Sequence, residues 1–210
     1  MTHFIRIQQY RIKVRRNLLA LIWFSATCLP SVSLAQPGLD AAARQKLKAG
    51  EILVEVIADP QGTEALINAV LDIAASPSQL WAVMLDCESS KRTIASLKSC
   101  RIVDKSPDES CDVREHVIQW IWPLPSVRSR FRSCYQPFQS IKFHRTEGDL
   151  AVLIGEWRLE PLNQGHATRL FYQSRISLGW PVPSSLVRAA LNADIPKTLS
   201  ALRREATGHE

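Results

Sequence analysis

The hydrophobic positions of this 210-residue chain alternate between a helical period and a period of two. Residues 39–48 carry apolar side chains at helical spacing and precede Gly50, which can end a helix. From residue 52 every second side chain is apolar, and Asp59-Pro60-Gln61-Gly62 then makes a turn. Residues 65–73 fit the return strand, so the pattern predicts a short helix followed by a β-hairpin.

The next segment predicts one helix and allows a second. Ser76 is a suitable N-cap residue, and Pro77 stands in the first turn, where a helix tolerates proline best. The residues that follow form one apolar face: Leu80, Trp81, Met84 and Leu85. A second short helix is compatible with residues 89–97.

Residues 100–178 have the pattern of successive strands separated by turns rich in Pro, Gly, Asp, Asn and Ser. The predicted strands cover residues 100–105, 113–122, 127–135, 141–146, 150–159 and 168–178. Because every connection is short, we expect an antiparallel meander.

The helical period returns at the C-terminus. Ser184 is a candidate cap, and one long apolar stripe follows it: Leu186, Val187, Ala190, Leu191, Ile195, Leu199 and Leu202. Pro196 lies inside this stripe and is expected to kink or interrupt the helix.

This order of elements predicts an α+β fold in which a curved antiparallel sheet wraps around a long C-terminal helix. Three groups of residues occur in a characteristic order: Ala75-Ser76-Pro77 with Leu80-Trp81 and Leu85-Asp86, then Gly155-Glu156-Trp157-Arg158-Leu159 with Ala167-Thr168-Arg169-Leu170, and finally Pro181-Val182-Pro183. In this order the chain resembles the START-like (SRPBCC) superfamily of polyketide cyclases and coenzyme Q-binding proteins, which share a helix-grip fold. The resemblance covers roughly residues 64–204.

The resemblance implies a hydrophobic cavity between sheet and helix that holds a lipid, isoprenoid or polyketide-like ligand. The chain offers aromatic side chains for such a cavity: Trp81, Trp120, Trp122, Phe131, Tyr135, Phe143, Trp157 and Tyr172. The helix would contribute Leu191, Ile195 and Leu199. The alternative is that these side chains simply fill the core.

The net charge of +6 is unevenly placed, since the first 35 residues hold five basic side chains and no acidic one. Removing them leaves 21 basic against 20 acidic residues. Residues 18–29 form a short apolar run, and Ser33-Leu34-Ala35 offers small residues at the two positions that signal peptidase recognises. We therefore expect a signal peptide cleaved after Ala35 and a periplasmic or secreted protein, with an uncleaved anchor as the alternative.

The chain then divides into the signal peptide (1–35), a helical lead-in (36–50) and one START-like ligand-binding domain (51–210). The mature part has four cysteines, an even number that predicts disulfides in an exported protein. We favour Cys87–Cys100 with Cys111–Cys134, because these pairs close a short loop and join neighbouring strands. Cys100 and Cys111 also flank one turn almost symmetrically, so a bridge between them stays open.

His116 is the main candidate for chemistry. In a strand, Arg114 and His116 point one way and Glu115 the other. His116 is suited to act as a general base or to orient a carbonyl or quinone oxygen, although such a residue is more often a satisfied or exposed strand histidine. The chain has no motif for a nucleophile, a nucleotide or a metal ion, so no cofactor is predicted.

Arg128, Arg130 and Arg132 share one face of a strand and offer a site for transient contact with an anionic membrane. The alternative is an ordinary solvated face. Nucleic-acid binding is not expected, because the mature chain is nearly neutral.

Three functional hypotheses follow. The leading one is an exported protein that binds or carries a hydrophobic small molecule. The second is a cyclase- or dehydratase-like enzyme on the same fold, with His116 as the acting group. The third is a non-catalytic accessory protein whose core is packed shut.

Overall fold

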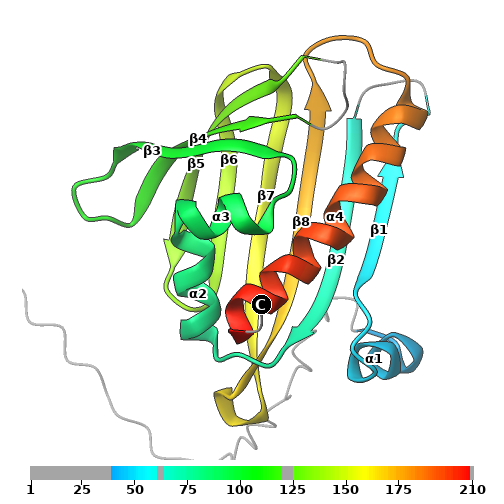
Figure 1. Ribbon diagram of the computed structural model, residues 1–210, viewed down its shortest axis with the longest axis vertical. Helices are drawn as coiled ribbons and strands as arrows, with labels where there is room; N and C mark the ends of the chain where they lie inside the picture. Colours follow the sequence, from blue (N-terminus) through cyan, green and yellow to red (C-terminus); the bar gives the residue numbers. More distant parts are fainter. Residues whose placement is uncertain (1–38, 61–63, 120–124, 209–210) are drawn as a thin grey trace, which may run out of the picture. The chain divides into compact units, whose positions relative to one another are not determined.

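The computed structural model describes residues 39–60, 64–119 and 125–208 (Figure 1). The predicted signal peptide therefore lies outside the described residues. The elements are α1 (Ala41–Lys48), β1 (Leu53–Ala58), β2 (Glu64–Ile73), α2 (Pro77–Leu85), α3 (Cys87–Thr93), β3 (Leu97–Lys105), β4 (Cys111–Ile118), β5 (Val127–Gln136), β6 (Ser140–Gly148), β7 (Leu150–Leu162), the 3-10 turn Asn163–Gly165, β8 (Ala167–Leu178) and α4 (Ser184–Thr207). No helix in these ranges is long and apolar enough to cross a bilayer.

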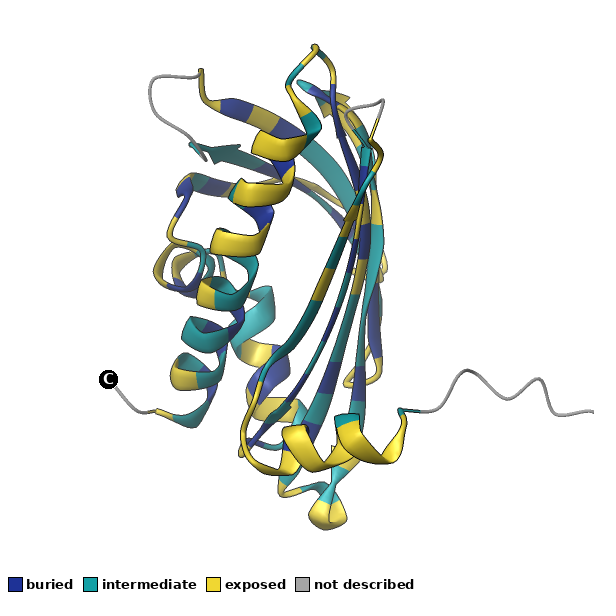
Figure 2. Cartoon of the chain, turned by 90° about the vertical axis from the view of Figure 1, so that its right-hand side faces the viewer, coloured by how far each residue is buried: buried dark blue, intermediate teal, exposed yellow. Residues whose placement is uncertain are grey.

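The eight strands form one antiparallel sheet in the order β1-β2-β8-β7-β6-β5-β4-β3. Strands β3 to β8 are the expected meander, and the β1–β2 hairpin is added at its far edge through pairing of β2 with β8. Helix α4 runs diagonally across the concave face of this curved sheet, as Figures 1 and 2 show. The α+β helix-grip prediction is confirmed.

The two short helices follow directly from their caps. Ser76 accepts a hydrogen bond from the backbone N–H of Gln79, and the Gln79 side chain accepts one from the Ser76 N–H, which completes a capping box. Asp86 then caps the next helix by accepting from the N–H groups of Glu88 and Ser89. This cap starts α3 at Cys87, so the helix expected over residues 89–97 was placed too late.

The start of α4 also differs from expectation. Ser184 is the first helical residue and not the cap; the N-cap position is Pro183, which offers no side-chain hydrogen bond. The helix continues without interruption through Pro196. Pro196 has no N–H group, so the carbonyl oxygen of Asn192 lacks its usual hydrogen-bond donor within the helix. Because Asn192 is solvent-exposed, water can donate to this oxygen instead. Leu186 is 45% exposed and does not belong to the buried stripe.

Two apolar clusters hold α4 on the sheet. One lies toward the C-terminal end of α4 and includes Leu71, Leu170 and Leu199. The other lies toward its N-terminal end and includes Ile67, Ile176 and Leu191. Tyr172 and Ile195 are half-buried and pack against both clusters. The space between the clusters is where a cavity remains.

Candidate functional site

A cavity of about 220 Å³ lies between the concave face of the sheet and α4. Its walls come from strands β2 and β4 to β8, from α2 and α3, and from the middle of α4. Most lining side chains are apolar, with a few polar groups on β4, β5 and α4. Such a composition is typical of a site for a small organic ligand.

Many of the side chains expected around a cavity do line it: Phe131, Tyr135, Phe143, Trp157, Tyr172, Leu191, Ile195 and Leu199. Trp81 is not among the lining residues. It is buried in the core, with its ring edge-on to Tyr135 at 6.1 Å and to Phe138 at 5.8 Å. The predicted cavity residues Trp120 and Trp122 lie outside the described residues.

The aromatic wall depends on a glycine. Phe143 of β6 pairs with Gly155 of β7, and a Cβ atom at Gly155 would lie 2.5 Å from the Phe143 ring. Any other residue at position 155 would therefore displace this ring. On the same wall, Trp157 and Tyr172 form a cross-strand pair with their rings stacked at 4.0 Å.

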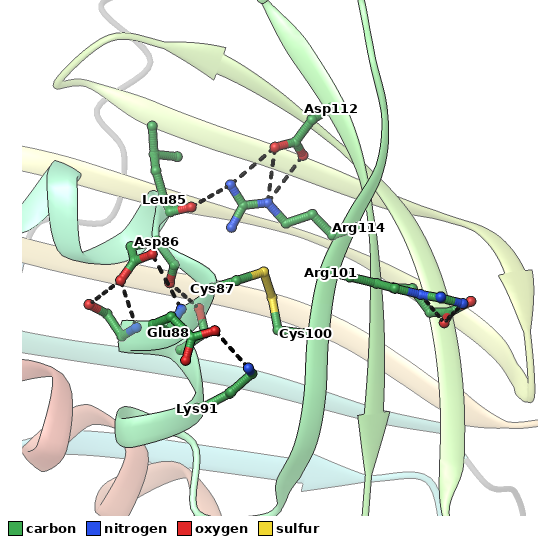
Figure 3. The surroundings of a disulfide bond; sticks show 12 residues. Leu85, Asp86, Cys87, Glu88, Lys91, Cys100, Arg101, Asp112 and Arg114 are labelled. Atoms are coloured by element: carbon green, nitrogen blue, oxygen red, sulfur yellow. Dashed lines mark hydrogen bonds and ion pairs between the residues drawn. A yellow bond between two sulfur atoms is a disulfide. The ribbon is translucent and has the colours of Figure 1, made fainter.

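A buried ion pair between Arg114 and Asp112 adjoins the cavity, which Arg114 lines. Figure 3 shows these two side chains. The Arg114 Nε atom lies 3.1 Å from both carboxylate oxygens of Asp112, and the two residues are only 6% and 5% exposed. The Nη2 group of Arg114 donates to the backbone oxygen of Leu85 at 2.9 Å and to the Tyr135 hydroxyl at 3.1 Å. Strand β4 is thus linked to the end of α2.

Burial and hydrogen-bond partners together set the pKa values of Arg114 and Tyr135 beside the cavity. Burial acts against the charge of Arg114, but the bonds to Asp112 and the contact with Tyr135 outweigh it and raise the pKa of the guanidinium. Burial also raises the pKa of Tyr135, so its phenol stays protonated. The cation is therefore compensated by its own carboxylate partner.

His116 stands two residues further along β4, on the same inner face. Its ring lies edge-on to Phe131, with the ring centroids 4.8 Å apart, and it lines the cavity. Burial and the nearby Arg114 cation lower the pKa of His116 to about 4, so the imidazole is neutral near pH 7. Its Nε2 atom is buried and has no hydrogen-bond partner among the described residues.

Glu115 faces the opposite side of the sheet, as the alternation of β4 predicts. Its Oε1 accepts from the Arg101 Nε at 2.8 Å, and its Oε2 accepts from the Arg130 Nε at 2.6 Å. The hydrogen bond from Arg130 is the main cause that lowers the pKa of Glu115. Arg130 also binds Glu147 at 2.8 Å. Within the predicted basic stripe, Arg130 is thus neutralised.

The other two arginines of the stripe form no ion pair with an acidic side chain in the described part of the chain. Arg128 is exposed and Arg132 is half-buried. Contact of this stripe with a membrane stays a prediction.

Helix α3 covers the cavity and is fastened on two sides. The Arg92 Nε donates to Glu205 of α4 at 2.9 Å, and just after α3 the hydroxyl of Ser96 donates to Asp194 of α4 at 3.0 Å. On the other side the Cys87–Cys100 disulfide joins α3 to β3 (Figure 3).

The second disulfide, Cys111–Cys134, joins residues that are direct partners on β4 and β5. Both bridges are the pairs favoured from the sequence. Together they fasten the β3–β4–β5 side of the sheet, which bears the polar wall of the cavity.

Several site residues escaped the sequence analysis: Asp112, Ser129, Ser133, Asp194 and Thr198. A signal for some of them was present, because Asp112, Arg114 and His116 are polar at a period of two within a strand. That pattern predicts a polar face, but it does not say whether the face points to solvent or inward. No group of three or more potential metal ligands occurs in the described ranges.

Comparison with known proteins identifies the family to which the fold corresponds. The model of the family described as "Polyketide cyclase / dehydrase and lipid transport" matches residues 73–203, which is more than half of the chain. No curated protein matches it.

Solved structures give the same result. The STAR-related lipid transfer protein from Xanthomonas axonopodis superposes with a TM-score of 0.61 at 16% identity, over 74% of this chain and 93% of that one. The Zhui aromatase/cyclase from a Streptomyces species gives a TM-score of 0.55 at 15% identity, over 69% and 92%. A START superfamily protein from Mycobacterium smegmatis gives 0.58 at 16% identity, over 68% and 97%. At such low identity these likenesses establish the fold alone.

Proposed function

Because this chain belongs to the polyketide cyclase/dehydrase and lipid transport family, we propose that it is an exported protein that binds and carries a hydrophobic small molecule. The ligand, of the lipid, isoprenoid or quinone class, would lie between the sheet and α4. The observation that carries the proposal is the cavity itself. Protein interiors are close-packed and have few voids larger than a water molecule, so a space of about 220 Å³ with an apolar wall is suited to a ligand.

The polar end of the cavity supports binding rather than mere imperfect packing. Burying the Arg114–Asp112 ion pair costs desolvation energy that a hydrophobic pair would not incur. A carrier can use such groups to orient the polar end of a mostly apolar ligand. The hypothesis of a core packed shut does not fit this cavity.

The enzyme hypothesis is weaker, although one relative is an aromatase/cyclase by name. A general base works best when its pKa lies near the working pH. His116, with a pKa of about 4, is a weak base at pH 7. We therefore assign it to ligand contact and not to proton abstraction.

Export remains part of the proposal. The basic, apolar and small-residue order of the first 35 residues supports it, as do the two disulfides, which persist in oxidising compartments. N-terminal sequencing of protein recovered from the cell envelope should find Gln36 as the first residue. A cytoplasmic protein that starts at Met1 with reduced cysteines would contradict export.

Native mass spectrometry of protein purified from its own envelope tests ligand carriage. We expect a bound hydrophobic compound on the wild type, and its loss from Ile195→Trp, because Ile195 lines the cavity and an indole would fill it. The matched control is Ala193→Trp on the exposed face of the same helix, which should keep the ligand. Equal occupancy of both variants, or a folded wild type that binds no apolar compound at all, would overturn the proposal.

A further inference from the structure

Two unpartnered polar atoms stand next to each other in the cavity wall. His116 of β4 and Ser129 of β5 are directly opposed in the register, and both side chains line the cavity. The Cβ atoms of such a pair lie about 5 Å apart. His116 Nε2 and Ser129 Oγ are both buried, and neither has a hydrogen-bond partner within the described part of the protein.

Such atoms are uncommon in native proteins, because a buried donor or acceptor without a partner loses the hydrogen bond it made with water. Here the two atoms come from neighbouring strands and face one space. A single oxygen atom of a ligand, placed between them, would satisfy both.

The charges around the cavity indicate which oxygen fits. The Arg114 cation is paired with Asp112, and the remaining charged lining residue is the carboxylate of Asp194 on α4. Arg145, which pairs with Phe131 on the inner face, donates to the backbone oxygen of Gly148 and does not line the cavity. The described lining residues therefore include no cation that is free to pair with an anionic ligand. A carboxylate or phosphate group in the cavity would lose its hydration without gaining a compensating ion pair.

The hydrogen-bonding capacity agrees with this. A neutral imidazole has one N–H donor and one acceptor nitrogen, and a serine hydroxyl both donates and accepts. A hydroxyl or carbonyl oxygen can complement this pair. The low pKa of His116 keeps the imidazole neutral throughout the neutral range.

The volume of the cavity limits the size of the ligand. A cavity of roughly 150 Å³ binds benzene, whereas sites for drug-sized ligands are typically about 300–1,000 Å³. The cavity of about 220 Å³ thus lies between these values. It is suited to a molecule of one or two rings, and a two-chain phospholipid would require α4 or α3 to move.

We propose that the cavity selects an uncharged molecule of one or two rings and holds its hydroxyl or carbonyl oxygen between His116 and Ser129. This inference rests on the proposed function, since it names the ligand class of the same cavity. It assigns His116 and Ser129 as residues that determine specificity.

Three probes of similar shape test the selection: naphthalene, 2-naphthol and 2-naphthoate, measured by equilibrium dialysis near neutral pH against the oxidised protein. We expect 2-naphthol to bind more tightly than naphthalene by about three- to tenfold for each hydrogen bond gained. We expect 2-naphthoate to bind more weakly than 2-naphthol by more than about tenfold, because its charge is buried without a partner.

Variants assign the selection to the two residues. His116→Leu and Ser129→Ala should each reduce the preference for 2-naphthol over naphthalene about three- to tenfold, while naphthalene binding is retained. The ratio of the two affinities is the useful quantity, since a general loosening of the fold would weaken both probes together. His144→Leu is the matched control, because His144 is exposed on the outer face of β6 and should leave the ratio unchanged.

The outcomes separate this inference from the proposed function. If naphthalene and 2-naphthol bind equally to the wild type, or 2-naphthoate binds most tightly, the inference is wrong while ligand binding stands. If Ser129→Ala and His116→Leu are folded and keep the wild-type ratio, the inference is likewise wrong. If no probe and no co-purified compound binds the folded protein, the proposed function fails as well.

Discussion

The inner faces of two strand pairs in the same sheet differ in character. On β2 and β8 most inward side chains are apolar, with Thr168 and Ser174 as polar exceptions, and residues such as Leu71 and Leu170 are completely buried under α4. On β4 and β5 the inward positions include Asp112, Arg114 and Ser129, which are equally buried but polar. The first pair makes the core, and the second makes the polar wall of the cavity.

One fold provides both stability and a binding site because the two strand pairs carry different side chains. Apolar side chains on β2 and β8 fill their space without directional requirements, so α4 packs closely against them. Polar side chains on β4 and β5 need partners, and they obtain some from each other and from the Leu85 carbonyl group. The partners that are missing, at His116 and Ser129, indicate where a ligand belongs.

The largest effect on stability is expected when one partner of the buried ion pair is removed. Asp112→Ala leaves the Arg114 cation buried without its carboxylate, and we expect a loss of about 3–5 kcal/mol in the free energy of unfolding. Urea denaturation followed by circular dichroism measures it. The double variant Asp112→Leu/Arg114→Met should recover most of the loss, and a single variant as stable as the wild type would refute our account of the polar wall.

The second largest loss of stability is expected from a substitution on the apolar strand pair, β2 and β8. Leu71→Ala creates a cavity at a completely buried position, and we expect it to destabilise the protein by about 3 kcal/mol. Leu66→Ala on the same strand is the control, because Leu66 points outward and is 40% exposed. Similar losses for both variants would show that β2 does not form the core as described. Ligand affinity should change little in either case.

The pH dependence of stability tests the same difference, because β4 carries a buried imidazole and neither β2 nor β8 contains a histidine. The pKa of His116 is lowered in the folded protein from 6.5 to about 4, so the folded state resists protonation that the unfolded state accepts. Stability is therefore complete above pH 6.5 and falls as the pH drops toward 4. At pH 5 this amounts to roughly 2 kcal/mol.

Measuring the free energy of unfolding between pH 8 and pH 4.5 tests this, and His116→Leu should flatten the profile. The carboxyl groups with lowered pKa values, such as Glu205 and Asp86, begin to lose their contribution as the pH approaches their ordinary pKa values of 4.5 and 3.8, and lose most of it below this window. His144→Leu, a substitution at an exposed position of β6, is the control. An unchanged slope in His116→Leu would contradict the burial of this imidazole.

The smallest effect is expected on the outer face of β4. Glu115 bridges Arg101 and Arg130 there. Its carboxylate is covered, but the two arginine side chains are 64% and 30% exposed, so solvent screens these ion pairs more than it screens Arg114–Asp112, in which both side chains are buried. Glu115→Gln should therefore change the midpoint of urea unfolding much less than Asp112→Ala does, and added salt should reduce the difference further. A loss that equals that of Asp112→Ala would mean that the two faces of β4 are not distinguished by solvent.

Much of the fold could be predicted from particular residues. The capping box at Ser76, the alternation along β4 and β5 and the apolar stripe of α4 each reflect a local rule that the sequence displays directly. The same rules misplaced α3, since Asp86 was not recognised as its cap. They also assigned Leu186 to the buried stripe, although Leu186 is exposed and its neighbour Val187 takes the buried position in the first turn of α4.

The candidate site could be predicted less well from these local rules. His116 and Arg114 were correctly placed on one face, but nothing in a strand's alternation says that this polar face points inward. Trp81 was expected at the cavity, yet its ring packs on Tyr135 and Phe138 behind the wall. Which rings line a cavity and which fill the core depends on contacts between elements distant in sequence.

By itself the sequence determined the order of the elements, the antiparallel pairing of short-connected strands and the two faces of each strand, because these follow from local period and turn chemistry. The tertiary structure alone decided that the polar face of β4 and β5 turns toward α4, and that Asp112 rather than Glu115 compensates Arg114. The reason is physical: burial and charge pairing depend on what the sheet's curvature and the path of α4 bring together, and neither is encoded in the spacing along one strand.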